Sequence, residues 1–392
     1  MNGPSRPAGR SAKLAQVSLT ALLCTLFTAC GGDGFHNGGI VLTMRQTTIT
    51  RGLWIANGTN VLEYTPTQLT AGGSSAAVPH LMNNSAAFGA PQGVTFDAKG
   101  NLWVMDPEAM VNGKKTPALL EFSAAQLAAL AATPAPTPVA TVTSTGLNFP
   151  QQSVFDAQGN QWVTDHNNNS VLVFTAAQLA MTGVNNLVPA VTITSADFNG
   201  PLGIAFDRNG DLWIANNGGV PVAGSTTGAM SAAGTTIVEF LAAHLPTPPA
   251  TGVLTPDLNP DVKLSDDGQN SIQAPWALVF DARGHLLSSN ANPPSTIVDF
   301  APGQLATTAA PVPVLIISPT TLGGIPTLDA PNGICFDNLE DLAVLNSAGA
   351  FGLAFFSNNQ KVNGAFPPAT FIVGAATTLN APAGCNFGPL VN

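Results

Sequence analysis

The chain has 392 residues, of which 45% are hydrophobic and only 9% are charged, and it contains 39 glycines and 32 prolines. An average soluble domain carries roughly 25% charged residues, so low charge with many turn formers favours an all-β protein over helices covered with ion pairs. The formal net charge of −10 argues against nucleic acid as a partner, because phosphate binding needs clustered Lys and Arg.

Residues 1–29 have the pattern of a signal peptide. Three basic residues precede an apolar run that is too short for a comfortable membrane span and ends in "LFTAC". This ending resembles a bacterial lipobox, with Phe27 where Leu is usual, and the resemblance implies a lipid on Cys30. Ordinary secretion and an uncleaved anchor are the alternatives. We therefore expect an exported protein, lipid-anchored in the cell envelope at the outer membrane or the periplasmic face, with residues 30–50 as a flexible tether.

One motif recurs along the rest of the chain. Its five complete copies are "APQGVTFDAKGNLWVMD" (90–106), "FPQQSVFDAQGNQWVTD" (149–165), "NGPLGIAFDRNGDLWIAN" (199–216), "QAPWALVFDARGHLLSSN" (273–290) and "DAPNGICFDNLEDLAVLN" (329–346). A sixth copy is split between "NAPAGCNFG" (380–388) and "GLWIAN" (52–57). Each copy predicts strand A, a tight turn and strand B.

A second element follows strand B in most copies. It combines a strand C with a helical turn, as in "LLEFSAAQL" (119–127), "VLVFTAAQL" (171–179) and "IVEFLAAHL" (237–245). Ser/Thr-x-x-Gln is a capping box, which Thr65, Ser123 and Thr175 fit; Leu241 and Ala301 lack the hydroxyl, so weaker turns are expected there. A short apolar strand D comes next.

Four short strands repeated every 50–75 residues predict the blade of a β-propeller. Six copies, the last completed from both chain ends, predict a closed six-bladed ring over residues 51–392, which leaves no open sheet edge. The units "PNGICFD" and "PLGIAFDRNGDLWIAN" resemble NHL repeats and the streptogramin-lyase and gluconolactonase-like propellers. The resemblance covers roughly residues 52–388 and implies a fold, not a function.

Two repeated residue types have a structural interpretation and a functional one. The aspartate before each A–B turn starts a hairpin turn that Gly closes, or binds a metal; "DRNGD" lacks the distal Glu of a calcium loop. The tryptophan of strand B packs between blades, or forms an exposed aromatic platform for sugar. We expect the turn and the packing, which apply to Asp97, Asp156, Asp207, Asp281, Asp337, Trp54, Trp103, Trp162 and Trp213.

The candidate ligand-binding residues lie where strand A begins and strand B ends. They are Gln92, Asp106, Asp165, His166, Asn167, Asn216, Trp276 and Asn332. Short Asp and Asn side chains at strand ends also bind their own backbone, so both roles stay open. In the gluconolactonase-like family the strand-A ring carries carboxylate and amide metal ligands, but here it has no Asp or Glu. We predict no catalytic residue, no metal and no cofactor.

Two further features concern loops and cysteines. Cys335 and Cys385 fall on inner strands of consecutive blades with opposite parity, so they face one another or point apart; an oxidising compartment favours a disulfide that pins the closing blade. The loop 216–235 has about twenty small, uncharged residues. It forms either a lid or a disordered segment.

These observations favour a non-catalytic binding or scaffold propeller whose ligand is an envelope protein, a peptide or a glycan. The alternative is a metal-dependent lyase or lactonase-type enzyme that uses Asp106, Asp165 and His166 on the face of the B–C loops. A third interpretation is a structural propeller that only contacts other envelope proteins.

Overall fold

The computed structural model describes residues 50–218, 235–249 and 251–391. The chain divides into Met1–Arg45 and Gln46–Asn392. The predicted signal 1–29, Cys30 and nearly all of the tether 30–50 lie outside the described residues, as do positions 219–234 of the long loop. The described helices include none long and apolar enough to cross a membrane.

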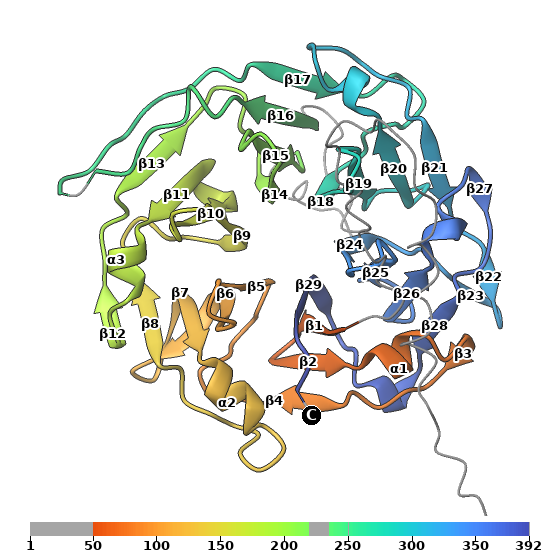
Figure 1. The fold of residues 1–392 in the computed structure, drawn as a ribbon, viewed down its shortest axis with the longest axis horizontal. Helices are drawn as coiled ribbons and strands as arrows, with labels where there is room; N and C mark the ends of the chain where they lie inside the picture. The colour runs from red at the N-terminus through yellow and green to blue at the C-terminus, as the bar shows by residue number, and fades with distance from the viewer. Residues whose placement is uncertain (1–49, 219–234, 250, 392) are drawn as a thin grey trace, which may run out of the picture. The chain divides into compact units, whose positions relative to one another are not determined.

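Six small sheets form a ring, as the sequence predicts (Figure 1). Blade 1 holds β5 (Gly93–Phe96), β6 (Leu102–Val111), β7 (Lys114–Phe122) and β8 (Ala140–Thr143). Blade 2 holds β9 (Pro150–Phe155), β10 (Gln161–Asp165), β11 (Ser170–Phe174) and β13 (Val191–Thr194). Blade 3 holds β14 (Pro201–Phe206), β15 (Leu212–Asn216), β16 (Thr236–Phe240) and β17 (Val262–Ser265).

The other three blades repeat this order of strands A to D. Blade 4 holds β18 (Pro275–Phe280), β19 (Leu286–Asn290), β20 (Thr296–Phe300) and β21 (Leu315–Ser318). Blade 5 holds β24 (Pro331–Phe336), β25 (Leu342–Asn346), β26 (Gly352–Phe356) and β28 (Thr370–Val373). Blade 6 holds β29 (Pro382–Pro389), β1 (Arg51–Asn57), β2 (Asn60–Tyr64) and β4 (Leu81–Asn83). A two-stranded hairpin, β22 (Thr321–Leu322) and β23 (Ile325–Pro326), follows blade 4.

Blade 6 closes the ring by pairing the two ends of the described chain. Strand β29 runs antiparallel to β1 from Arg51 opposite Pro389 to Asn57 opposite Pro382. The two candidate cysteines, whose pairing the sequence left open, form a disulfide: Cys335 on β24 is bonded to Cys385 on β29, with their Cα atoms 6.1 Å apart. The disulfide joins the inner strands of blades 5 and 6, so the closing blade is covalently fixed to its neighbour.

The helical turns after strand C differ in their caps. The three whose N-cap hydroxyl accepts a hydrogen bond from the main chain of the N3 residue are α-helical: α1 (Pro66–Leu69), α2 (Ala124–Ala128) and α3 (Ala176–Leu179). Ala301 begins only the 3-10 turn η3 (Pro302–Gln304), and Leu241 only an irregular turn. Ser357 and Gln360 form a sixth unit, η4 (Asn358–Gln360), that the sequence reading missed. The other 3-10 turns are η2 (His166–Asn168) and η5 (Ala375–Thr377).

The outer rim joins blades 2 to 6 each to the preceding blade, which the sequence did not predict. After its helical turn the chain sends a short segment to pair in parallel with strand D of the preceding blade. These segments are β12 (Gly183–Asn186) on β8, β27 (Gly364–Ala365) on β21, and β3 (Gly73–Ser75) on β28. Isolated bridges do the same at β13 and β17. Paired outer edges cannot template aggregation.

The tryptophans of strand B pack between blades, as expected. Each indole lies edge-on to the aligned phenylalanine of the next blade, with ring centroids 5.6–6.4 Å apart in Trp54–Phe96, Trp103–Phe155, Trp162–Phe206 and Trp213–Phe280. At the last two junctions Leu287 shares a cluster with Phe336, and Ala343 with Phe387. All four indoles are buried, so none offers a platform for sugar.

Candidate functional site

The central channel is lined by the inner strands of all six blades. Its cavity has a volume of about 380 Å³ and is bordered mainly by main chain and by apolar side chains such as Val94, Ile204 and Leu278. Its polar side chains are Gln152, Ser153 and Asn386; its lining includes no carboxylate or imidazole.

The predicted strand-A residues sit just outside this cavity. Gln92, Trp276 and Asn332 occupy matching positions at one end of the inner strands, but none of them lines the cavity. Gln92 donates to Ala90 O at 3.1 Å, and buried Asn332 accepts a hydrogen bond from Ser347 Oγ at 2.9 Å. Trp276 is half-buried. These side chains share a face, yet they do not converge on one point of the cavity.

The strand-B ends form a buried ring of six Asp and Asn residues that hold the incoming D–A loops. All six are fully buried: Asn57, Asp106, Asp165, Asn216, Asn290 and Asn346. In blades 1 to 5 the side chain accepts hydrogen bonds from main-chain N–H groups about 16 residues upstream, as Asp106 does from Gly89 and Ala90. Each asparagine also donates its amide to a carbonyl of the same loop, in blade 6 to Thr378 O. Asn57 instead reaches the chain's C-terminal segment.

Two members of this ring are carboxylates. Burial raises the pKa of Asp106, although three main-chain N–H groups donate to it, from Gly89, Ala90 and Glu108. Burial likewise raises the pKa of Asp165, which accepts from the main chain of Asn148 and Phe149 and from the side chain of Asn168. These contacts occupy both oxygens of each group and give them a structural role.

His166 and Asn167 follow directly in η2. His166 is 9% exposed, its Nδ1 lies 3.0 Å from Asn167 Oδ1, and its ring lies edge-on to Phe149. Asn216 is committed to Asn199 N, Asp197 O and Thr236 Oγ1. The predicted cluster therefore consists mostly of residues that stabilise their own loops.

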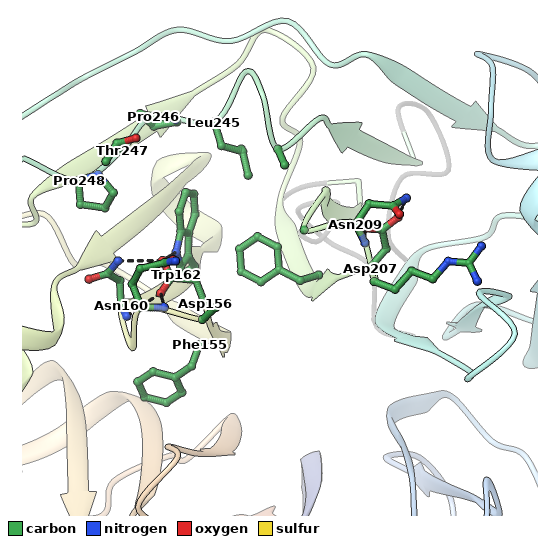
Figure 2. A pocket seen from close by; sticks show the side chains of 16 residues that line it. Phe155, Asp156, Asn160, Trp162, Asp207, Asn209, Leu245, Pro246, Thr247 and Pro248 are labelled. Carbon is green, nitrogen blue, oxygen red and sulfur yellow. Dashed lines mark hydrogen bonds between the residues drawn. The ribbon is translucent and has the colours of Figure 1, made fainter. Parts of the chain in front are cut away.

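A large pocket lies on the opposite face, between the A–B turns of blades 2 and 3, where no site was predicted (Figure 2). Its volume is about 840 Å³. Half-buried Phe155 and Phe206 border it together with Leu245, and the segment 246–248, Pro-Thr-Pro, forms one wall. The oxygens of Asp156 accept hydrogen bonds from its own turn and from Trp162 Nε1. Gln158 also lines the pocket, and its exposed side chain has no hydrogen-bond partner among the described residues.

The turn aspartates on this face act as predicted. In all five complete copies Oδ1 of the aspartate accepts the main-chain N–H groups two and four residues later, as Asp97 does from Lys99 and Asn101. The residue three positions on has a positive φ, which is +80° at Gly100 and +62° at Glu340, the one non-glycine. Left-handed backbone favours glycine.

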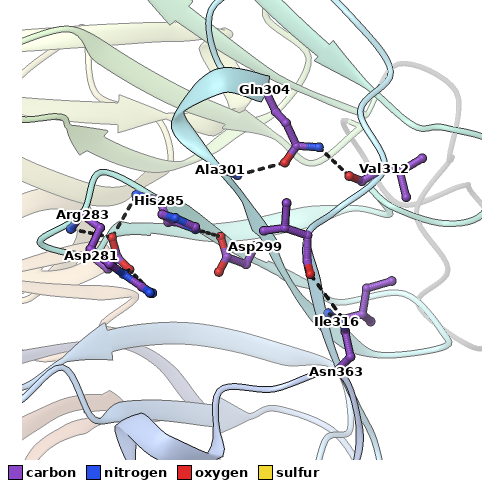
Figure 3. A network of polar contacts seen from close by, with 10 residues as sticks. Asp281, Arg283, His285, Asp299, Ala301, Gln304, Val312, Ile316 and Asn363 are labelled. Carbon is purple, nitrogen blue, oxygen red and sulfur yellow. Dashed lines mark hydrogen bonds and ion pairs between the residues drawn. The ribbon is translucent and has the colours of Figure 1, made fainter.

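In blade 1 the residue four positions after the turn aspartate links the turn to strand C and to the helical turn that follows it. Asn101 donates to both Asp97 and Glu121 at 2.9 Å, and its Oδ1 accepts from Ala124 N at the start of α2. In blade 4 the helical turn starts with Pro302, which has no N–H, and this position is His285 (Figure 3). His285 Nδ1 lies 2.8 Å from Asp299 Oδ1. The amide of Asn101 in blade 1 and the imidazole of His285 in blade 4 thus lie between the turn aspartate and the acid of strand C.

Blade 3 lacks such a donor. Here the residue four positions after the turn aspartate is Asp211, which accepts a hydrogen bond from Ala242 N at 2.7 Å. One carboxylate oxygen each from Asp207, Asp211 and Glu239 lie within 4.8 Å of one another. Burial, and then the charges of Asp211, Asp207 and Asp261, raise the pKa of Glu239 to about 7. Sequence reasoning missed this group because Glu239 comes from strand C, 32 residues after Asp207. The sequence does contain one sign of this group, which is Asp211 at the position where blades 1 and 2 have asparagine.

Comparisons with known proteins define the class of fold. No protein-family profile and no curated protein matches the sequence. A solved protein of unknown function from Bacteroides caccae is 8% identical, and the match covers 87% of this chain and 100% of that one with a TM-score of 0.53. A streptogramin B lyase is 13% identical over 69% of this chain, with a TM-score of 0.38. The match spans 66% of the lyase's own length.

The likeness to the Bacteroides caccae protein shows the fold alone. The chain is a six-bladed β-propeller of four-stranded blades, whose last blade combines strands from both ends of the described chain.

Proposed function

We propose that this protein is a non-catalytic, NHL-type binding propeller, lipid-anchored through Cys30 in the cell envelope, that binds an extended peptide segment of another envelope protein. The observation that carries the proposal is the pocket between blades 2 and 3, of about 840 Å³. Ligand pockets typically combine an apolar floor with a few polar groups. Phe155, Phe206 and Leu245 supply the floor, and Gln158 can bond to a peptide main chain.

The charge of the pocket supports a neutral peptide. Its acids, Asp156 and Asp207, accept hydrogen bonds from their own turns, and the guanidinium of its cation Arg208 lies beside Gly284 of blade 4. An extended peptide presents main-chain donors and acceptors that an amide side chain matches, with apolar side chains for the floor. The enzyme alternative has less support, since Asp106 and Asp165 both use their oxygens on loop N–H groups.

Filling the pocket tests the proposal. A library of random peptides displayed on phage is selected on the full chain, and binding of the selected peptides is measured by calorimetry. Ala157→Trp places an indole in the pocket from an exposed position and should abolish binding. Ala282→Trp, at the same turn position of blade 4, is the control and should bind like the wild type.

Three outcomes count against the peptide. They are selection of no peptide, equal binding by Ala157→Trp, and binding of soluble envelope glycan fragments in place of peptides. The anchor is tested separately, because Cys30→Ser should move the protein from the membrane fraction to the soluble fraction of the cell. An unchanged membrane fraction would refute lipidation at Cys30.

A further inference from the structure

The three carboxylates of blade 3 are the starting point. Asp207 is half-buried, while Asp211 and Glu239 are only 8% and 6% exposed. Three like charges this close and this buried repel one another, and burial of an unpaired charge is costly. In blades 1 and 4 the middle side chain donates a hydrogen bond to the strand-C acid, but Asp211 in its charged form has no hydrogen to donate. A cation bound between the three acids relieves this repulsion, as does a proton on one of them.

Two unpartnered polar groups face the same cavity, which has a volume of about 270 Å³ and lies between blades 3 and 4. The Glu239 carboxylate has no hydrogen-bond partner among the described residues. Trp213 lies directly opposite Glu239 in the register of β15 and β16. Its side chain is 1% exposed, and its Nε1 has no hydrogen-bond acceptor among the described residues. In blade 2 the equivalent Trp162 donates to Asp156, whereas in blade 1 Trp103 Nε1, like Trp213 Nε1, has no acceptor among the described residues. The buried Glu239 carboxylate without a partner distinguishes blade 3, and a buried polar group in that state points to a bound species that satisfies it.

No side chain in the described parts of the chain supplies the missing charge. Arg208 lines the cavity, but its guanidinium lies toward Gly284 and forms no ion pair with the three acids within the described ranges. His244 is paired with Asp261 at 2.8 Å. The other charged group near Glu239 is Asp261 itself, which adds to the repulsion.

We propose that Asp207, Asp211 and Glu239 form a Ca²⁺ site that ties the A–B turn of blade 3 to strand β16. All three ligands are hard oxygens with no nitrogen or sulfur among them, which suits Ca²⁺ and not Zn²⁺. Ca²⁺–oxygen distances of about 2.3–2.6 Å allow ligands up to roughly 5 Å apart on opposite sides of the ion, and the separation here is within 4.8 Å.

The remaining coordination fits the cavity. Asp211 uses Oδ1 to accept from Ala242 N, which leaves its Oδ2 for the ion. Water completes the six to eight ligands that Ca²⁺ takes, and Trp213, whose N–H can donate to such a water, lines the same cavity. The sequence "DRNGD" lacks the distal glutamate of a calcium loop; Glu239 provides it from a neighbouring strand.

The test uses the full chain, freed of metal with a chelator and titrated with Ca²⁺ alone. We expect one Ca²⁺ per chain by calorimetry and a rise of several degrees in Tm, because a ligand that binds only the folded state stabilises it. Glu239→Gln should abolish both. Asp211→Asn should abolish them too, and its metal-free Tm should equal or exceed that of the metal-free wild type, since the amide then donates to Glu239 as Asn101 does to Glu121.

Glu108→Gln is the matched control. It removes one carboxylate from an exposed pair with Lys115 in blade 1, and it should keep the full response to Ca²⁺. Absence of heat and of a Tm shift in the wild type would overturn the site, as would a full response in Asp211→Asn. A larger Tm shift with Mg²⁺ than with Ca²⁺ would overturn the choice of ion.

Discussion

Two rings of Asp and Asn residues, one on each face of the propeller, look alike in the sequence and differ in the structure. The ring at the strand-B ends is uniform, because all six members are buried and hold the D–A loops. At the A–B turns only the aspartate makes the same contacts in all five complete copies. The residue four positions later varies from amide to imidazole to carboxylate. In a repeat protein, shared positions build the fold, and departures from the repeat mark candidate sites.

The largest effect should come from breaking the uniform ring. Asp106→Ala removes the acceptor for the N–H groups of Gly89, Ala90 and Glu108. Unsatisfied buried donors cost about 1–3 kcal/mol each, partly relieved by water, so we expect a loss of about 3 kcal/mol in the free energy of unfolding. Denaturant unfolding measures it. Asp106→Asn keeps one acceptor and should lose less than half as much; a loss below about 1 kcal/mol in the alanine variant would contradict the structural role.

The pH dependence of stability should reveal the buried acid Glu63 on the face of the A–B turns. Burial raises its pKa from an ordinary value of 4.5 to about 7, opposed by the hydrogen bond from Val391 N. The folded protein therefore holds a proton that the unfolded chain releases, so wild-type stability should fall as pH rises from about 4.5 to about 7, by about 3 kcal/mol. Glu63→Gln should remove this dependence when unfolding is followed by urea across that range. Identical pH profiles for the two proteins would refute it.

A smaller loss should follow from changing the variable ring. Asn160→Ala removes the hydrogen bonds to Asp156 Oδ2 and from Ala176 N. Because both groups lie near the surface of the face and can bond to water, we expect a loss of about 1 kcal/mol in the free energy of unfolding. Asn160→Asp is the informative partner, since it keeps the acceptor for Ala176 but loses the donor. A cost larger than that of Asp106→Ala would reverse the order of the two rings.

The smallest effect on stability belongs to the rim of the pocket. Gln158 is exposed and its side chain holds no other group in place. Gln158→Ala should leave the free energy of unfolding within about 0.5 kcal/mol of the wild type and weaken binding of selected peptides several-fold. Calorimetry and denaturant unfolding on the same preparation separate the two quantities. Weakened binding together with a large loss of stability would assign Gln158 to the fold.

The sequence by itself determined the propeller. The spacing of the aligned phenylalanines, the Asp-to-Gly turns and the split sixth copy encode strand order and closure locally, and the structure confirms each of them. It also brought Cys335 and Cys385 to neighbouring strands, leaving open whether they face one another. These features repeat, so their physical cause can be identified by comparing copies within one chain.

Only the tertiary structure decided which polar groups remain free. Asp106 and His166 looked like ligands, yet the loops that approach them occupy or bury their polar atoms. The acidic group of blade 3 and the pocket beside it join residues from different strands or different blades. Burial and the use of each hydrogen-bonding atom depend on which chain segments meet in space. A residue's type and its place in a repeat do not specify that.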